Sequence, residues 1–549
     1  MSSTKKSDRR PRLFRWPVLL PLLAFVLSTT GGLLAQPADA PAQPVIVTCT
    51  SAAGDPDRQH CDADTSAGVL LQRSVGSAEC LLGRNWGYDG QGVWVSEGCS
   101  GEFLVSGVPL QEPVEPPVQT VESAETPAEG VETAESAEAP TEEAAAPADD
   151  HPEERWGFLD PGKGFLLGKG KGGEMSLSAY ALVRYMNQMD DDGIFFDHLG
   201  RERPVKERED IFSQRVLVWL SGWVGVPKLE YLITFWALNA TNDSRLFGNI
   251  NYRFNKHFNL AAGVNGNPGS RSVLGSHPYW LGHDRVMADE LFRAAFTFGI
   301  WANGEIVPGL FYDVSVGNSS TGLGSTALDL DRKFTSGGSV WWMPTTKEFG
   351  PRGAYGDWEM HEKLATRFGF SVSRSPEQRY QDVGEDPTNS ALKLVDSVNL
   401  FETGSLAPDV TITFADYALL AVDAGLKYRG IFFQTEVYWR TLDGFEADGP
   451  LPVSKIEDQG FYVQAAFFPI PKKLELYAAT SQIYGDEDAG FGDANEYLGG
   501  LNWYLAKTRN HRINLQVIDV NRSSVDSAFG YYTGGQTGTT VSLAASVFF

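Results

Sequence analysis

Seven basic side chains beyond residue 200 have the chemistry of an anion filter. Arginine presents forked donors that fit phosphate and carboxylate oxygens, and lysine supplies a compact positive charge. The same stretches also carry Asp423, Glu436 and Glu475, so ion pairing inside a polar interior is the alternative. The candidate side chains are those of Arg293, Arg271, Arg285, Arg215, Arg367, Lys427 and Arg440.

All four cysteines lie in one stretch near the N-terminus. An even set in an exported segment predicts two disulfide bonds. Zinc is the less favoured alternative, because the stretch has neither a CxxC nor an HxxxH spacing. Several pairings are open, and closeness along the chain favours Cys49–Cys61 together with Cys80–Cys99.

The remaining motifs predict no catalytic residue, no cofactor and no metal ion. The glycine-rich run Gly168–Gly173 is not followed by the helix-opening Gly-Lys-Ser/Thr of a phosphate loop. The acidic runs Asp190–Asp192 and Asp486–Asp488 lack the full ligand spacing of a calcium loop. No nucleophile motif stands out. The net charge of −25 excludes nucleic acid as a partner, since no basic surface balances the phosphates.

The N-terminus has the features of an export signal. Four arginines precede an apolar run from Val18 to Leu27, and small residues follow near Ala35. A membrane anchor is the alternative, but the run is shorter than the roughly 20 residues of a spanning helix. We therefore predict a signal peptide over residues 1–35.

Two further segments precede the bulk of the chain. Residues 45–104 contain the cysteines and form a predicted disulfide-rich β module, which is too small for a large core and relies on its disulfides. Residues 105–155 consist almost entirely of Pro, Ala, Glu, Val, Ser and Thr. Such a composition cannot bury enough apolar surface to fold, so we predict a disordered acidic linker.

The rest of the chain, residues 157–549, has the pattern of an all-β protein. Aromatic residues and glycine are abundant, with 14 Trp, 19 Tyr, 32 Phe and 58 Gly. In the stretch 363–374, Phe368 and Phe370 alternate with Arg367 and other polar or small residues. In a transmembrane β-barrel the apolar face meets lipid and the polar face lines the lumen. The pattern therefore predicts a transmembrane antiparallel β-barrel.

The same alternation assigns Arg293 to the lumen. In a strand over 291–302, Ala294, Phe296, Phe298 and Ile300 would face lipid, and Arg293 and Thr297 would face inward. The opposite assignment would place an arginine in hydrocarbon, which costs about 2–4 kcal/mol near the midplane.

Connections along this region alternate between short turns and long polar loops. Asn303-Gly304 and Arg429-Gly430 are examples of the predicted turns, and Asn267–Glu290 is one of the loops. The long connection Pro344–Glu362 breaks the rule, because it falls where a short turn is expected. The pattern predicts about sixteen strands with both ends of the barrel in the periplasm. These strands are 174–188, 211–223, 229–238, 245–254, 258–265, 291–302, 305–317, 335–343, 363–374, 417–428, 431–442, 459–468, 473–484, 495–505, 511–521 and 538–549.

The last strand ends in Val547-Phe548-Phe549. A terminal aromatic after alternating apolar residues resembles the signal by which outer-membrane barrels are recognised by their insertion machinery. An ordinary terminal strand is the alternative. With the export signal, the ending predicts insertion into a bacterial outer membrane through Phe549.

Three stretches resemble the phosphate-selective porin O and P family. They are Asp160–Tyr185, Met287–Trp301 and Ser339–Gly353, and the likeness extends diffusely over residues 157–549. It implies a sixteen-stranded barrel, a homotrimer and an inward-folded loop that narrows the pore. Members of this family often begin with a coiled coil, which the cysteine module and linker replace here.

The cysteine module resembles a small family of cysteine-paired exported domains of unknown function. The similarity lies in the cysteines and in Trp86-Gly87, Val93–Val95 and Phe103. It implies export and a small β-fold, with no activity. A periplasmic or cell-wall ligand is one expectation for this module, and a structural spacer is the other.

These features predict an outer-membrane porin for passive diffusion of small hydrophilic solutes, with phosphate or other anions as one class. A porin of general or cation preference is an alternative, as is an anchor that presents the cysteine module in the periplasm. A catalytic barrel is disfavoured because no Ser/His or Asp/His constellation is evident.

Overall fold

The computed structural model describes residues 45–105 and 164–549, apart from gaps at 53–54, 56, 64, 66–68, 77, 79, 81–83, 90–91, 190–192, 239–242, 275–278, 320–332, 384, 388–391 and 528–529. The chain divides into two compact units, Met1–Thr141 and Glu142–Phe549. The predicted signal peptide, residues 1–35, and residues 106–155 of the predicted linker lie outside the described residues.

The N-terminal unit consists of two three-stranded antiparallel sheets, β1-β6-β3 and β2-β5-β4. Its core contains Val93, Val95 and the tilted ring pair Trp86 and Phe103, whose ring centroids lie 5.0 Å apart. The strands are β1 (Val45–Thr50), β2 (Gln59–Cys61), β3 (Val69–Ser74), β4 (Trp86–Asp89), β5 (Gly92–Val95) and β6 (Ser100–Val105).

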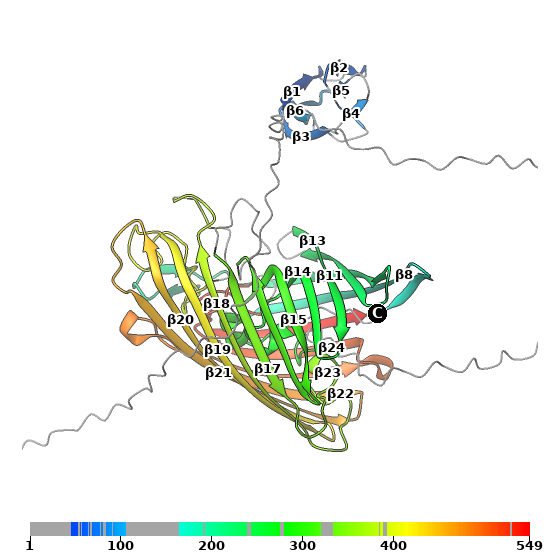
Figure 1. Cartoon of the computed structure of the whole chain (residues 1–549). Coiled ribbons are helices and arrows are strands. Elements are labelled where there is room, and N and C mark those ends of the chain that lie inside the picture. The colour runs from blue at the N-terminus through cyan, green and yellow to red at the C-terminus, as the bar shows by residue number, and fades with distance from the viewer. Residues whose placement is uncertain are drawn as a thin grey trace, which may run out of the picture. The chain divides into compact units, whose positions relative to one another are not determined.

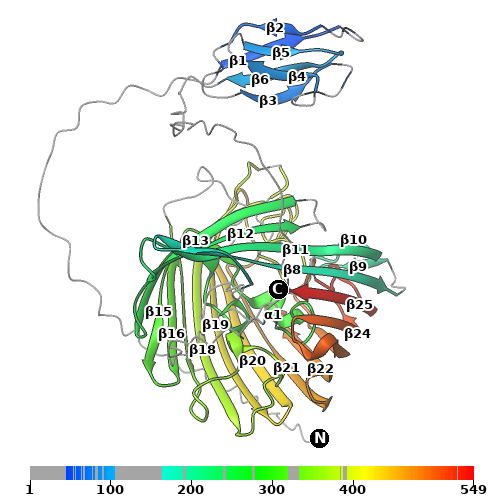
Figure 2. The same ribbon diagram turned by 90° about the vertical axis from the view of Figure 1, so that its right-hand side faces the viewer.

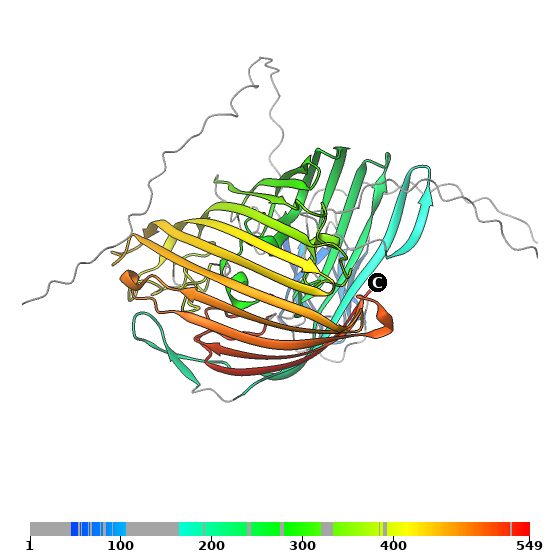
Figure 3. The same cartoon turned by 90° about the horizontal axis from the view of Figure 1, so that it is seen from below.

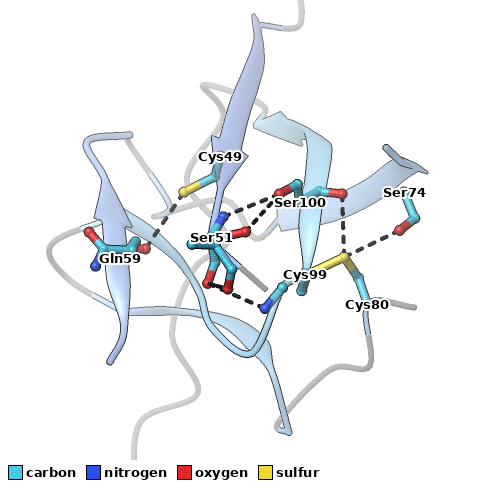
Figure 4. The surroundings of a disulfide bond; sticks show 9 residues. Cys49, Ser51, Gln59, Ser74, Cys80, Cys99 and Ser100 are labelled. Carbon is cyan, nitrogen blue, oxygen red and sulfur yellow. Dashed lines mark hydrogen bonds between the residues drawn. A yellow bond between two sulfur atoms is a disulfide. The ribbon is translucent and has the colours of Figure 1, made fainter. Parts of the chain in front are cut away.

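Two disulfides cross-link this unit (Figure 4). Cys49 is bonded to Cys61, and Cys80 to Cys99, so the predicted pairing is confirmed. The first bond ties β1 to β2, which belong to different sheets. The second fixes the loop before β4 to the residue that precedes β6. Because the unit is small, such cross-links contribute much of its stability.

The second unit is a closed antiparallel barrel made of β8 and the fifteen strands β11 to β25, with β25 pairing back to β8 (Figure 1). The predicted sixteen-stranded barrel is therefore confirmed. Its strands are β8 (Gly173–Gln188), β11 (Glu209–Val224), β12 (Leu229–Leu238), β13 (Asp243–Asn255), β14 (Phe258–Gly266), β15 (Phe296–Val307), β16 (Leu310–Gly317), β17 (Thr335–Trp342), β18 (Ala365–Gln378), β19 (Ile412–Tyr428), β20 (Ile431–Ala447), β21 (Lys455–Ile470), β22 (Leu474–Tyr484), β23 (Ala494–Tyr504), β24 (His511–Asn521) and β25 (Gly538–Phe548).

An additional strand, β7 (Phe165–Gly170), completes the seam. It pairs with the first residues of β8, while β25 pairs with the rest of the same edge. The terminal residue Phe549 exchanges backbone hydrogen bonds with Ala179, and its ring lies 5.2 Å from that of Phe165. β7 thus continues the line of β25 along β8.

We call the end of the barrel with the short connections the turn end, and the opposite end the loop end. At the turn end, residues 256–257 join β13 to β14 and residues 429–430 join β19 to β20. The loop end carries the long connections, including 189–208 with its hairpin β9 (Ile194–Phe196) and β10 (Glu202–Pro204). This alternation of short and long connections is typical of bacterial outer-membrane barrels.

Side-chain exposure confirms the predicted faces. On β18, Phe368 and Phe370 are each 50% exposed, whereas Arg367 is fully buried. On β24, Leu515 and Val517 are exposed and Gln516 is buried. An exposed apolar outer face and a polar inner face fit a barrel surrounded by lipid. Among the described residues no helix has the length and apolarity to cross a bilayer.

One predicted strand and one predicted turn are wrong. The strand expected over 291–302 begins only at Phe296, because residues 287–292 form helix α1 (Met287–Phe292). The turn expected at Asn303-Gly304 lies instead at Pro308-Gly309, where Gly309 has a φ of 84°. Proline followed by glycine suits a tight turn with positive φ. Gly304 remains in β15, where a Cβ atom would lie 2.2 Å from the His257 carbonyl oxygen.

Among the connections that the structure describes, four fold into the barrel and are packed with apolar side chains. Three come from the loop end, 267–295, 379–411 and 522–537, and one comes from the turn end, 343–364. Buried residues from each belong to one hydrophobic cluster with the inner wall, among them Phe292, Phe349, Phe401 and Tyr532. Short 3-10 helices complete the structure: η1 (Arg271–Leu274), η3 (Pro351–Gly353), η4 (Glu487–Ala489) and η5 (Leu505–Lys507).

Candidate permeation pathway

The connection 267–295, which joins β14 to β15, occupies the middle of the lumen (Figure 2). The backbone N–H of Met287, at the start of α1, donates to the Glu496 carboxylate at 2.8 Å. At the other end of the helix, the Phe292 carbonyl accepts from the Tyr417 hydroxyl at 2.7 Å. The inward-folded loop implied by the family resemblance is therefore present, and it is bonded to strands on two sides of the barrel.

The connection 343–364 explains why one turn-end connection is long. It enters the lumen from the turn end and meets the loop-end connection there, since the Tyr355 N–H donates to the Tyr279 carbonyl at 2.9 Å. Arg271 reinforces the junction by donating to the Gly353 carbonyl at 2.6 Å. Segments from opposite ends of the barrel thus form one packed layer inside it.

The four candidate cations on strands all face inward and are all held by protein groups. Arg367 donates to Asp423 at 3.0 Å, and Arg440 to Asp458 at 3.0 Å. These two pairs join neighbouring strands, because Arg367 is on β18 and Asp423 on β19, and the second pair bridges β20 and β21. Each side chain is at most 2% exposed. Their charges are neutralised within the wall.

Arg215 and Lys427 are bonded to the inward connections. Arg215 and the inward-facing Arg184 both pair with Asp284 of the connection 267–295. Lys427 donates to the Phe349 carbonyl at 2.6 Å, and its Nζ lies 3.9 Å from a Glu359 oxygen. These side chains attach the connections to the wall.

The three candidates in the connection 267–295 also have acidic neighbours. Arg293 caps α1 and lies 3.0 Å from Glu290, and Arg285 lies 3.5 Å from Asp289. The fully buried Arg271 lies 3.8 Å from Asp423. Arg293 was predicted to face the lumen from a strand over 291–302. In the structure it lies in the inward connection 267–295, at the end of α1, and not on a strand.

The seven candidates leave out further inward arginines, among them the buried Arg184 and Arg512. Arg184 is fully buried on β8, and alternation with Leu182 and Met186 along that strand could have identified it. Arg512 of β24 donates to the carbonyls of Trp280, Leu281 and Gly282. No sequence signal could have predicted those partners, because carbonyl groups from a distant connection carry no residue-type signature.

A second polar cluster lies in the connection 343–364. His361 bonds to Asp357 through Nδ1 and to Glu348 through Nε2, the latter at 2.9 Å. Burial alone opposes the charged imidazole, but the hydrogen bonds from these two carboxylates outweigh it and raise the pKa of His361 to about 9. Burial also works against both carboxylates, yet bonding to His361 lowers the pKa of Asp357 and of Glu348.

Asp357, Glu359 and His361 each bring a ligand atom to within 4.8 Å of one another, a spacing compatible with a metal ion. The bonding pattern favours an ion-pair network instead. Both ring nitrogens of His361 are engaged by carboxylates, and Glu359 lies 3.0 Å from Arg509. A metal ligand must be a deprotonated imidazole, whereas this one is held as a cation. The donor set therefore does not fit a metal as it stands.

Two sequence families match this chain. Residues 46–138 match a family of proteins of unknown function (DUF3011), and residues 399–534 match the phosphate-selective porin O and P family. A search of curated proteins found no match.

Solved structures with a similar barrel include outer-membrane OmpT of Vibrio cholerae, with 13% identity and a TM-score of 0.45 over 70% of this chain and 99% of that one. An anion-selective porin from Comamonas acidovorans has 13% identity and a TM-score of 0.41, covering 69% of this chain and 100% of that one. The channel DcaP of Acinetobacter baumannii has 11% identity and a TM-score of 0.38, covering 70% and 99%. The two family matches confirm the predicted two-part architecture: a segment that matches a family of unknown function precedes a porin-like outer-membrane barrel whose residues 399–534 match the phosphate-selective porin O and P family.

Proposed function

We propose that this protein is a porin through which small hydrophilic solutes diffuse passively across a bacterial outer membrane. The observation that supports this most directly is the closed sixteen-stranded barrel with an apolar outer face and a polar, charged inner face. Polar lumen residues give water and solutes hydrogen-bonding partners that hydrocarbon does not offer. The family match over residues 399–534 supports the same function.

Phosphate or anion preference is the finer part of the proposal. A pore selects anions when cations at its narrowest point are available to the passing ion. The seven basic candidates are held by carboxylates or carbonyls, so their excess positive charge is small. The family match over residues 399–534 is the support for anion preference.

We further propose that the barrel assembles as a homotrimer, is delivered by the insertion machinery through Phe549, and carries the cysteine module on its periplasmic side. Both ends of the barrel lie at the turn end, which is the periplasmic end in bacterial barrels. The exposed ring of Phe549, at the end of the outward-facing alternation of β25, supports recognition by that machinery.

A structural anchor is the second candidate, favoured by the inward connections that pack against the inner wall. Conductance of the purified full-length protein in a planar bilayer discriminates the two. Stepwise single-channel currents support the porin. A protein that is correctly folded and inserted but passes no current would contradict it and favour the anchor. The reversal potential across a salt gradient, recorded in the same bilayer, measures anion preference directly.

The separation into two units predicts that the barrel inserts without the N-terminal region. Residues 156–549, expressed behind a signal peptide, should reach the outer membrane as the full chain does. Failure of the truncated chain alone would mean that the cysteine module or the linker assists assembly.

A further inference from the structure

The inner wall of the barrel is tightly covered along strands β20–β25 and more accessible along β13. Figure 3 shows β20–β25 as the yellow to red strands, and β13 belongs to the green strands. Along β20–β25, ten polar inner side chains are each at most 1% exposed, because the inward connections pack against them. They are Gln434, Glu436, Tyr462, Glu475, Ser481, Glu496, Asn514, Gln516, Thr540 and Ser542.

The inner face of β13 is different. Arg245, Phe247 and Asn249 are half-buried, Asn251 is 8% exposed and Arg253 is exposed. These alternate residues extend from the loop end to the turn end of the strand. We call them the β13 track. Its register places it on the lumen side, since Asn251 faces the inward Glu230 of β12.

The outer face of the same strand is apolar and exposed, which shows that the track is on the lumen side. Leu246 and Ile250 alternate with the track and are 74% and 56% exposed. An apolar face this accessible must meet hydrocarbon, so the polar track between these residues is the side that meets water.

Neighbouring strands extend the polar surface. Asn259 of β14 and Asn303 of β15 are half-buried inner residues beside the track. Both side chains keep part of their surface accessible, unlike the inner side chains of β20–β25. Half-buried carboxamides of this kind can exchange hydrogen bonds with water and with a passing solute.

The charges near the track are largely paired at the turn end. Arg253 pairs with Glu230, and Asn251 donates to the other oxygen of Glu230 at 3.1 Å. The middle of the track offers asparagine amides, which donate and accept hydrogen bonds equally, together with the ring of Phe247. Such a lining matches solutes with hydroxyl or amide groups and discriminates weakly by the sign of charge.

We propose that solutes cross the barrel along the β13 track, and that this path takes small neutral solutes bearing hydroxyl or amide groups in addition to ions. The proposal rests on the porin function proposed above. It locates the conducting part of the lumen beside the inner face of β13, away from the buried arginine pairs.

Single cysteines test the location, because the native cysteines are all disulfide-bonded and an introduced thiol is the only reactive one. Asn249→Cys and Asn303→Cys are each inserted in a planar bilayer and treated with a negatively charged methanethiosulfonate. Loss of most of the single-channel current on modification is expected for both variants, since the added group would stand in the path.

Two matched control variants are treated with the same methanethiosulfonate. Ile250→Cys lies next to Asn249 on the lipid face, and Ser542→Cys lies on the inner face of the covered wall; neither should lose current. Loss of current in Ser542→Cys, with full current in labelled Asn249→Cys, would overturn the proposed location. Wild-type protein that passes no current would instead overturn the porin function itself.

The solute class is tested by swelling of liposomes that contain the wild-type protein in iso-osmotic sugar. Arabinose should enter, and labelled Asn249→Cys should slow its entry strongly. Exclusion of arabinose by a barrel that conducts ions would contradict the solute class. In the bilayer, Arg245→Glu should shift the reversal potential towards cations. An unchanged reversal potential would show that the loop-end part of the track does not lie on the conducting path.

Discussion

Arg293 and Glu290 form a two-point ion pair at the end of helix α1: Nε lies 3.1 Å from one carboxylate oxygen and Nη2 lies 3.0 Å from the other. The partners are three residues apart, and the side chains are 18% and 21% exposed. Their opposite charges cancel at short range, so Arg293 stabilises the inward connection and contributes little field to the lumen.

This pairing predicts the outcome of Arg293→Gln. Loss of the guanidinium should leave the reversal potential across a salt gradient close to that of the wild type, because the cation was already neutralised. The thermal unfolding temperature should fall, since Glu290 loses its partner. A clear shift of the potential towards cations, in a correctly inserted barrel, would show that Arg293 belongs to the selectivity filter after all.

The pair of Arg367 and Asp423 predicts a large loss of stability. Both side chains are at most 2% exposed. Arg367→Met should destabilise the barrel by about 3–5 kcal/mol, because it leaves a buried carboxylate without its main partner. Arg374→Met is the matched control on the same strand: its side chain is 70% exposed and pairs with Asp416, so the expected loss is about 0–1 kcal/mol. Equal losses in both variants, measured by thermal unfolding in detergent, would contradict this account.

The His361 cluster predicts that the connection 343–364 is held most firmly at mildly acidic pH. The pKa of His361 is raised from 6.5 to about 9, so its contribution is complete below 6.5 and is lost as the pH rises through 9. The pKa values of Asp357 and Glu348 are lowered, so their contributions are present above their ordinary values of 3.8 and 4.5 and are lost on further acidification. Stability should therefore be highest between these limits.

Hydrogen exchange of the connection 343–364 measures this pH dependence. After correction for the intrinsic exchange rate, protection should decline from pH 6 to pH 9 in the wild type. His361→Asn should remove that decline, because an amide does not titrate. If the variant kept the wild-type profile, the dependence would come from another group.

The disulfides predict that the N-terminal unit depends on oxidation. The unit is small, so removing one cross-link by the double change Cys80→Ser and Cys99→Ser should cost roughly 2–5 kcal/mol. Protease digestion of the full chain should then cleave this unit and leave the barrel intact. Thiol labelling of denatured, unreduced wild-type protein should find no free thiol. Two or more labelled thiols would contradict the pairing.

Much of the barrel was predictable from the sequence because its physical cause is local. Lipid surrounds the outer face, so each strand must alternate apolar with polar residues, as Phe368, Phe370 and Arg367 do. The positions of most strands and the pairing of the cysteines follow from such short-range patterns. The prediction failed at residues 291–295, because Ala294 continues the alternation of Phe296 and Phe298, although α1 ends at Phe292 and β15 begins only at Phe296.

Only the tertiary structure decided which side chains of the inner wall are paired, covered or accessible. The sequence identifies Arg271 and Arg440 as cations on the polar side, but their partners Asp423 and Asp458 are distant in sequence and meet them only through the pairing and packing of the folded chain. It also contains no pattern for the connections that cover β20–β25 and leave the β13 track accessible. A side chain's type determines which face of a strand it takes, since solvent and lipid act on each residue separately. Whether that side chain is free or paired depends on groups brought together from several segments, which only folding decides.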